Sequence, residues 1–238
     1  MKIALIGYGK MGKMLEHTAL TRGHEIVSKI DLDNFDDFSS VEFCSADVAL
    51  EFTAPYVAEQ NIRAAWAQNV KVVSGTTGWT SGLQAMQNEL KTNGKTLFWA
   101  SNFSLGVNIF FEINRYLAKI MNDFSQYDLN IEEIHHLEKK DAPSGTAITL
   151  AENILSQIDR KESWTLSPEK NLKDIEITAL RKENVLGIHT TKYESPEDTI
   201  TLTHNAKNRA GFALGAVLAA EFLHDKNGFY TMKDLLKF

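Results

Sequence analysis

The sequence predicts an α/β protein built from two parts. The first is a doubly wound parallel sheet, and the second is a smaller α+β domain with a mixed or antiparallel sheet. Up to residue 100, short apolar strands alternate with helical segments, which is the order of a parallel sheet with crossover helices. Beyond Asn102, several strands follow one another without long helices between them. A final apolar helix can return to the first sheet, so we expect domains at 1–103 with 209–238 and at 104–208.

Each strand and helix of the first part is an apolar or amphipathic run that ends at a turn residue. Lys2–Ile6 has the pattern of a buried strand and stops at Gly7, and the helix after it stops near Gly23. Pro55 opens the helix that follows the third strand. The sequence predicts strands at 2–6, 25–30, 48–52, 70–73 and 96–100 and helices at 10–22, 55–68 and 82–91, with a polar connection at 33–37.

The second part combines two helices with strands in series. Strands that follow one another through loops are typical of an antiparallel or mixed sheet. The sequence predicts helices at 107–122 and 147–158, strands at 128–136, 174–181, 188–193 and 199–204, and a last helix at 211–224.

Composition excludes several classes of protein. The 238 residues are 43% hydrophobic and carry a net charge of -6, so no basic surplus favours a nucleic-acid partner. The longest apolar stretch, Phe212–Leu223, contains Glu221 and is shorter than the ~20 residues of a membrane span. The N-terminal apolar run is too short for a signal peptide. A single cysteine, Cys44, excludes an internal disulfide, so we expect a cytoplasmic protein without a membrane partner.

A glycine motif follows the first strand and opens the first helix. Gly7-Tyr8-Gly9-Lys10-Met11-Gly12 matches the dinucleotide fingerprint of Rossmann-type domains. Gly7 allows the tight turn, Gly9 lets a pyrophosphate approach the backbone, and Gly12 allows close packing of helix on strand. The alternative is a tight turn without a ligand. We expect the dinucleotide, held at the N-terminus of the helix.

Two further segments bear on the cofactor. Asp31 ends the second strand, where a carboxylate can accept hydrogen bonds from an adenosine ribose and repel a 2′-phosphate. Its neighbour Leu32 cannot pair with that phosphate, so NADH is the predicted cofactor and NADPH remains possible; the alternative is a solvated acidic turn. Gly75-Thr76-Thr77-Gly78 ends another strand, at the edge where parallel sheets bind ligands, although an ordinary tight loop fits this tetrapeptide equally well.

The segment 133–147 carries the most chemistry. His135 and His136 end a strand, Lys139 follows, and Pro143-Ser144-Gly145-Thr146 opens a helix. A histidine can donate a proton near neutral pH, a lysine supplies positive charge, and the first amides of a helix hold a carboxylate. No metal site is expected, because adjacent histidines on a strand point to opposite faces. Glu132 and Glu133 are interpreted as strand residues that orient the histidines or face solvent.

The run Glu-x-His-His-x-x-Lys-x-Asp-Ala-Pro-Ser-Gly-Thr-Ala resembles the signature of the 4-hydroxy-tetrahydrodipicolinate (dihydrodipicolinate) reductase family of lysine and diaminopimelate biosynthesis. The resemblance includes Ser101-Asn102-Phe103-Ser104 and the segment 212–217. It implies reduction of a cyclic dicarboxylate by a nicotinamide cofactor in a homotetramer built through the second domain. The implied proton donor is His135 and its cationic partner is Lys139. The implied substrate contacts are His136, Gly145 and Thr146. The implied cofactor contacts are Gly7, Gly9, Lys10, Met11, Gly12, Asp31, Phe52, Gly75, Thr77, Ala100, Ser101, Asn102 and Phe103.

The chain departs from the family pattern at a few positions. Glu51 and Ala54 stand where many members have Asp and Arg, and Leu137 and Glu138 replace a basic pair. Loss of the arginine favours NADH over NADPH. Two other functions stay open at this point: another small NAD(P)-dependent dehydrogenase on the same cofactor domain, and a non-catalytic NAD-sensing protein. The segment 133–147 argues against both.

Overall fold

The computed structural model describes residues 1–166 and 171–238, which form two compact units. Unit 1 comprises Met1–Leu105 and Ala210–Phe238, and unit 2 comprises Gly106–Arg209. Each unit has its own sheet and its own apolar core.

Unit 1 contains a six-stranded, fully parallel sheet in the order β11-β5-β4-β3-β1-β2. The chain passes from β1 outward to β2 and then returns to β3 on the other side of β1. This reversal of direction between β1 and β3 is where such sheets bind dinucleotides, at the carboxyl ends of the strands. The strands are β1 (Lys2–Ile6), β2 (Glu25–Ile30), β3 (Val48–Glu51), β4 (Lys71–Ser74), β5 (Thr96–Trp99) and β11 (Gly228–Tyr230).

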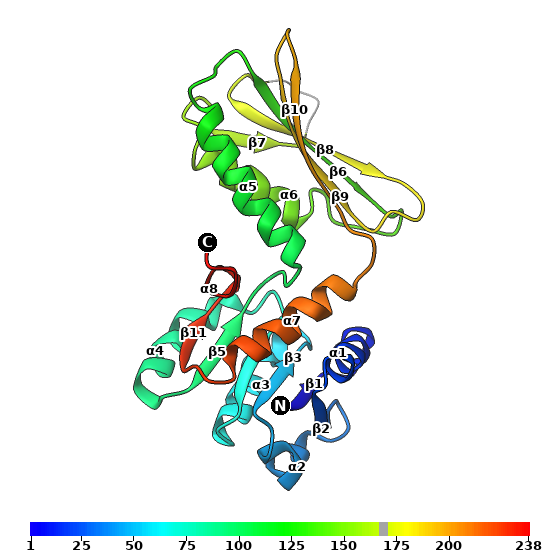
Figure 1. Cartoon of the computed structure of the whole chain (residues 1–238), viewed down its shortest axis with the longest axis vertical. Coiled ribbons are helices and arrows are strands. Elements are labelled where there is room, and N and C mark those ends of the chain that lie inside the picture. Colours follow the sequence, from blue (N-terminus) through cyan, green and yellow to red (C-terminus); the bar gives the residue numbers. More distant parts are fainter. Residues whose placement is uncertain (167–170) are drawn as a thin grey trace. The chain divides into compact units, whose positions relative to one another are not determined.

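Helices cover both faces of this sheet (Figure 1). Helices α1 and α7 pack side by side on one face, where Leu15 and Val217 meet strand residues such as Leu50. Helices α2, α3 and α4 cover the other face. The bounds are α1 (Lys10–Thr21), α2 (Val41–Cys44), α3 (Pro55–Ala67), α4 (Leu83–Asn93), α7 (Ala210–Leu223) and α8 (Met232–Leu236), with 3-10 turns at Phe35–Ser39 and Thr80–Gly82.

Unit 2 is a five-stranded mixed sheet in the order β10-β9-β6-β8-β7, with α5 and α6 on one face (Figure 1). Strand β6 is parallel to β8 and antiparallel to β9. Alternate residues of β6, among them Leu129 and Ile131, point to the helices and form the core. The elements are α5 (Leu105–Met121), β6 (Asp128–His135), α6 (Gly145–Leu155), β7 (Ser163–Thr165), β8 (Asp174–Arg181), β9 (Ile188–Glu194) and β10 (Thr199–Asn205).

The predicted fold class is confirmed: a parallel sheet with helices on both faces and a second, mixed sheet. The sequence missed four short elements, namely α2, α8, β7 and β11. Strands of three residues are too short to show a period, and β11 is a strand only because it pairs with β5. The segment 33–37 was also interpreted too simply, because the 3-10 turn there places Phe38 in the core.

No helix within residues 1–166 and 171–238 combines the length and the hydropathy that crossing a membrane requires.

Candidate active site

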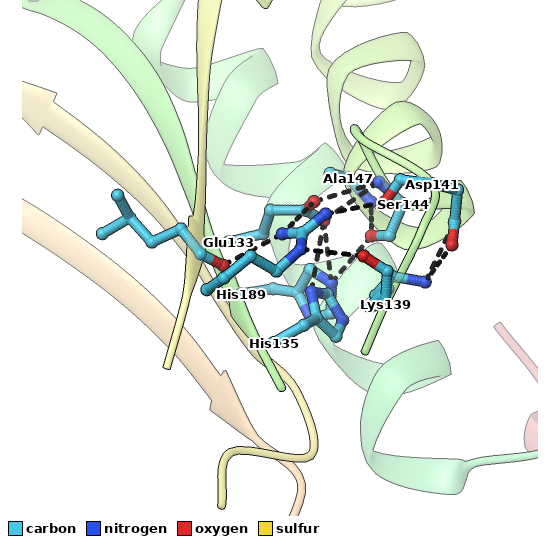
Figure 2. A network of polar contacts seen from close by, with 9 residues as sticks. Glu133, His135, Lys139, Asp141, Ser144, Ala147 and His189 are labelled. Carbon is cyan, nitrogen blue, oxygen red and sulfur yellow. Dashed lines mark hydrogen bonds and ion pairs between the residues drawn. The ribbon is translucent and has the colours of Figure 1, made fainter. Parts of the chain in front are cut away.

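The polar cluster of unit 2 gathers where β6 ends (Figure 2). Glu133 and His135 lie two residues apart on β6, so their side chains share the helix-covered face. His189 on β9 is the cross-strand partner of Glu133. The rings of His135 and His189 meet edge to face with centroids 5.0 Å apart, and both side chains are buried. Three titratable groups from two strands therefore lie close together in the interior of unit 2.

Glu133 is the centre of this cluster. Its side chain is fully buried, and both carboxylate oxygens accept the backbone N–H of Ser144 at 3.1 Å. Nδ1 of His135 and Nε2 of His189 each lie 3.7 Å from Oε2, and Nη1 of Arg181 lies 3.8 Å from Oε1. Donors and positive charge therefore surround the carboxylate. Its hydrogen bonds with Ser144 join the strand of His135 to the start of helix α6.

Ser144 caps helix α6. Its Oγ accepts the N–H of Ala147 at 3.2 Å and pairs with Nε2 of His189 at 3.1 Å. The next two residues, Gly145 and Thr146, begin the helix, and amides in a first turn have no partner within their own helix. A Cβ built on Gly145 meets nothing within 4 Å. The backbone at Gly145 is thus accessible to a carboxylate, which the positive end of the helix dipole would stabilise.

The loop between β6 and α6 presents Lys139. The Nζ of Lys139 lies 2.9 Å from both oxygens of Asp141, and His136, half-buried, accepts the N–H of Lys139 through its carbonyl at 3.2 Å. Arg181 holds this loop from β8, because it donates to the carbonyl of Lys139 at 3.2 Å and to that of Asp141 at 2.7 Å. Figure 2 shows Lys139 and Asp141 close to the histidines. The predicted pair of His135 and Lys139 thus lies in one cluster.

Burial and hydrogen bonding together set the electrostatics of the cluster. Burial and the charge of His189 lower the pKa of His135 well below its usual value, although Glu133 opposes them. Burial raises the pKa of Glu133, but the contacts with His189 and Ser144 outweigh burial and lower that pKa well below its usual range. At neutral pH the cluster therefore holds an anionic Glu133 beside a neutral His135. The Nδ1 atoms of His135 and His189 are both buried, and neither has a hydrogen-bond partner among the described residues.

These residues could also attract a metal ion, since ligand atoms of Glu133, His135 and His189 lie within 4.8 Å of one another. The amide of Ser144 already occupies both oxygens of Glu133, and Arg181 lies beside them. A cation would have to displace these partners. The donor set fits an internal hydrogen-bonding network better than a metal centre.

The glycine motif of unit 1 has the geometry of a dinucleotide cradle. Gly7 has a φ of +91°, and a Cβ there would lie 2.3 Å from the carbonyl oxygen of Phe52. A Cβ on Gly12 would lie 2.3 Å from the carbonyl oxygen of Gly7. A Cβ on Gly9, by contrast, would meet nothing within 4 Å. Gly9 is the N-cap of α1 and provides no side-chain cap. The first amides of α1 therefore remain available to a diphosphate, which is an arrangement that fits the cofactor.

A cavity of about 350 Å³ lies beside this motif. Four predicted cofactor residues line it, namely Gly7, Gly9, Asp31 and Phe52. The carboxylate of Asp31 accepts the N–H of Tyr8 at 3.3 Å and that of Leu32 at 2.9 Å. The rest of the lining includes Leu32, Phe35, Ala54, Tyr56 and Val57. An apolar slot with one carboxylate at its edge suits an adenosine.

The other predicted cofactor residues lie around this cavity and do not line it. Lys10, Met11 and Gly12 form the first turn of α1. Gly75 and Thr77 follow β4, and a Cβ on Gly75 would overlap the ring of Phe52. Ala100, Ser101, Asn102 and Phe103 follow β5, where Phe103 is buried and its carbonyl packs against Gly215. All of them therefore belong to the carboxyl-terminal edge of the parallel sheet or to the helix beside it.

Sequence reasoning missed much of the cluster around His135. Arg181, His189 and the capping role of Ser144 were not identified, and Glu133 was interpreted only as an orienting or solvated strand residue. Ser144 and His189 are 45 residues apart, and their contact depends on strand register. The usable signal was Ser144 at the first position before a helix, which is a typical N-cap.

Known proteins resemble this chain over nearly its whole length. Models of the N-terminus and the C-terminus of dihydrodipicolinate reductase match residues 1–103 and 106–236. A protein from Christiangramia forsetii named 4-hydroxy-tetrahydrodipicolinate reductase is 49% identical over 236 residues, covering 99% of this chain and 98% of its own. One of the same name from Archaeoglobus fulgidus is 34% identical over the full length of both chains. The solved structure of a dipicolinate-bound dihydrodipicolinate reductase from Paenisporosarcina sp. TG-14 has the same fold, with a TM-score of 0.79, 23% identity and 97% of each chain covered. The chain belongs to the dihydrodipicolinate reductase family.

Proposed function

We propose that this chain reduces 4-hydroxy-tetrahydrodipicolinate to tetrahydrodipicolinate with a nicotinamide cofactor, in the cytoplasmic synthesis of diaminopimelate and lysine. One observation supports this most strongly: His135 and Lys139 lie in one cluster with the N-terminus of α6, which Ser144 caps. A dehydrogenase for a neutral substrate would not need the carboxylate site, and a sensor would need no proton donor beside it. Nothing in the comparisons favours either alternative.

The residues have separate tasks in this proposal. When bound, the cofactor supplies a hydride. The amides of Gly145 and Thr146 hold one substrate carboxylate, and Lys139 exchanges Asp141 for the substrate's negative charge. His136 is proposed as a further substrate contact. The 4-hydroxyl of the substrate leaves as water, so that one hydride and one proton complete the reduction to tetrahydrodipicolinate. His135 delivers that proton, after the charge of the bound dianion has raised its pKa.

Loss of the proton donor tests the assignment. Replacing His135 with Gln should lower kcat about 10²–10⁴-fold and leave NADH affinity unchanged, since the glycine motif lies in the other unit. The assay follows NADH oxidation with freshly generated substrate. His17→Gln removes an exposed histidine of α1 and serves as the control. A His135→Gln enzyme with nearly wild-type kcat between pH 6 and 8, where chemistry limits the rate, would refute the role.

The cofactor is proposed to be NADH, with NADPH a weaker ligand. Among the residues that line the cavity there is no lysine or arginine, and the carboxylate of Asp31 lies at its edge beside Leu32 and Ala54. A 2′-phosphate would meet this carboxylate without a guanidinium to pair with it. Calorimetric titration with both cofactors measures the preference. Equal or tighter binding of NADPH contradicts it.

The assembly is proposed to be a homotetramer built through unit 2. Strand β10 is an edge strand of seven residues, three of them threonine, and one face of its sheet carries no helix in the described part of the chain. Such an edge needs a partner or protection. Light scattering should give the mass of four chains at micromolar concentration. A monomer under these conditions overturns the proposal.

A further inference from the structure

Glu51 is a buried charge without a counter-ion. It is the last residue of β3, its side chain is fully buried, and in residues 1–166 and 171–238 no lysine, arginine or histidine forms an ion pair with it. Burying a carboxylate costs several kcal/mol unless strong partners compensate. Packing alone therefore does not explain a carboxyl group at position 51.

Three hydroxyl groups compensate this charge, and a second donor orients two of them toward it. Thr76 Oγ1 accepts the N–H of Thr53 at 2.9 Å, so its own proton points to Glu51 Oε1 at 2.8 Å. Thr53 Oγ1 accepts the amide of Asn61 at 3.2 Å and donates to the same oxygen. Ser74 donates to Oε2 at 2.6 Å. Because each hydroxyl donates inward, the network fits an ionised carboxylate, which only accepts.

The network lies at the strand ends where the nicotinamide half of a dinucleotide belongs. The cofactor crosses the sheet at the reversal between β1 and β3, and Asp31 after β2 marks its adenosine side. The other half therefore lies toward β3 and β4, on the loops that start at Phe52 and Gly75. Thr53 and Asn61 also line the cavity proposed for the adenosine, so the network borders the proposed cofactor site. Glu51 also accepts the N–H of Gly75 through its carbonyl at 3.0 Å.

We propose that Glu51 is a positioning residue that holds the two nicotinamide-side loops together and places a standing negative charge beneath them. This inference rests on the proposed use of a nicotinamide cofactor. Transfer of the hydride to the substrate leaves the ring with one positive charge, and a fixed anion in a water-poor site stabilises that charge without reorganisation. Glu51 thereby shifts the bound cofactor pair toward its oxidised form.

The test compares two dissociation constants, measured by calorimetry on the whole chain. In wild type, NAD⁺ and NADH are titrated separately. Glu51→Gln keeps the shape and removes the charge, so the ratio of the NAD⁺ to the NADH dissociation constant should rise about 3- to 30-fold. Glu51→Asp keeps the charge on a side chain that is shorter by one methylene group. The ratio for this variant should lie between those of wild type and Glu51→Gln. Glu25→Gln removes an exposed carboxylate at the opposite edge of the sheet and should leave the ratio unchanged.

Each outcome is decisive. Ratios within 1.5-fold of wild type in the folded Glu51 variants would show a merely structural role and overturn the inference, while reductase activity stands. If circular dichroism shows that Glu51→Gln does not fold, Glu51→Asp alone decides by the same criterion. A wild-type chain that binds neither NAD⁺ nor NADH would overturn the proposed function together with the inference.

Discussion

His135 shows how burial and charge set the state of a single residue. The side chain of His135 is 9% exposed and lies beside Glu133 and His189, with Lys139 and Arg181 adding positive charge. Burial and this positive charge favour the neutral ring, and Glu133 alone favours the protonated one. His135 is therefore neutral at neutral pH, and we expect it to take up a proton when an anionic ligand binds beside it. An unperturbed histidine would already be partly charged near pH 6.5.

This residue gives a prediction about proton uptake. A dianionic ligand such as dipicolinate should raise the lowered pKa of His135, so binding takes up protons at pH values between the ligand-free and the bound pKa. Uptake should vanish well above the bound value, where the ring stays neutral in both states. Calorimetry in buffers of different ionisation enthalpy counts the protons. His135→Gln should abolish the uptake, and a wild-type count of zero from pH 5 to 7 would contradict the prediction.

At the scale of elements, the turn from β1 to α1 separates two uses of glycine. Gly12 is required by packing, because a Cβ there would lie 2.3 Å from the carbonyl oxygen of Gly7. A Cβ on Gly9 would meet nothing within 4 Å, so packing does not require glycine there, and we propose that the missing side chain leaves room for a ligand. Gly12 thus serves the fold, and Gly9 serves the proposed cofactor site.

This contrast is testable with two matched variants. Gly12→Ala should destabilise unit 1 by about 1–3 kcal/mol, because backbone must move to admit the methyl group. Gly9→Ala should change stability little but weaken NADH binding at least tenfold, since its methyl group occupies the space of the pyrophosphate. Denaturant titration and calorimetry measure the two quantities. If Gly9→Ala binds NADH as wild type does, the cofactor does not approach this backbone.

The elements also show what sequence could and could not predict. The glycine motif and the segment 133–147 are local, so their residue order alone indicated a turn, a helix start and their chemistry. The contact between Glu133 and His189 depends on the register of β6 with β9. The hydrogen bonds of Glu51 depend on hydroxyl groups of residues 74–76, on the neighbouring strand β4 and the loop after it. No local pattern encodes such pairings. Strand β11 was missed for the same reason, since its partner β5 lies far away in sequence.

At the scale of the whole molecule, each unit has its own core and its own proposed ligand. In the proposed function, NADH binds through residues of unit 1 and the dicarboxylate through residues of unit 2. A ligand at 100 times its dissociation constant stabilises the state that it binds by about 2.7 kcal/mol. Each ligand alone should therefore protect mainly the unit that holds it.

Hydrogen exchange followed by mass spectrometry measures this selectivity. With NADH alone, amides of β1, β3 and α1 should exchange more slowly, while those of β6 and β9 should keep their rates. Dipicolinate alone should give the reverse pattern. Equal protection of both units by NADH alone would show that they open as one cooperative body, contrary to this prediction.

The division of unit 1 between the two ends of the chain imposes an order on its biosynthesis. Residues 210–238 supply α7, β11 and α8, and α7 covers the sheet face that carries Leu50 and Phe98. When that face emerges from the ribosome, its cover is still untranslated, whereas unit 2 is continuous and can complete its core first. Translating the intervening residues takes roughly 5–20 s. During this interval the nascent chain displays an uncovered apolar sheet, which makes it a client for chaperones that bind such surfaces.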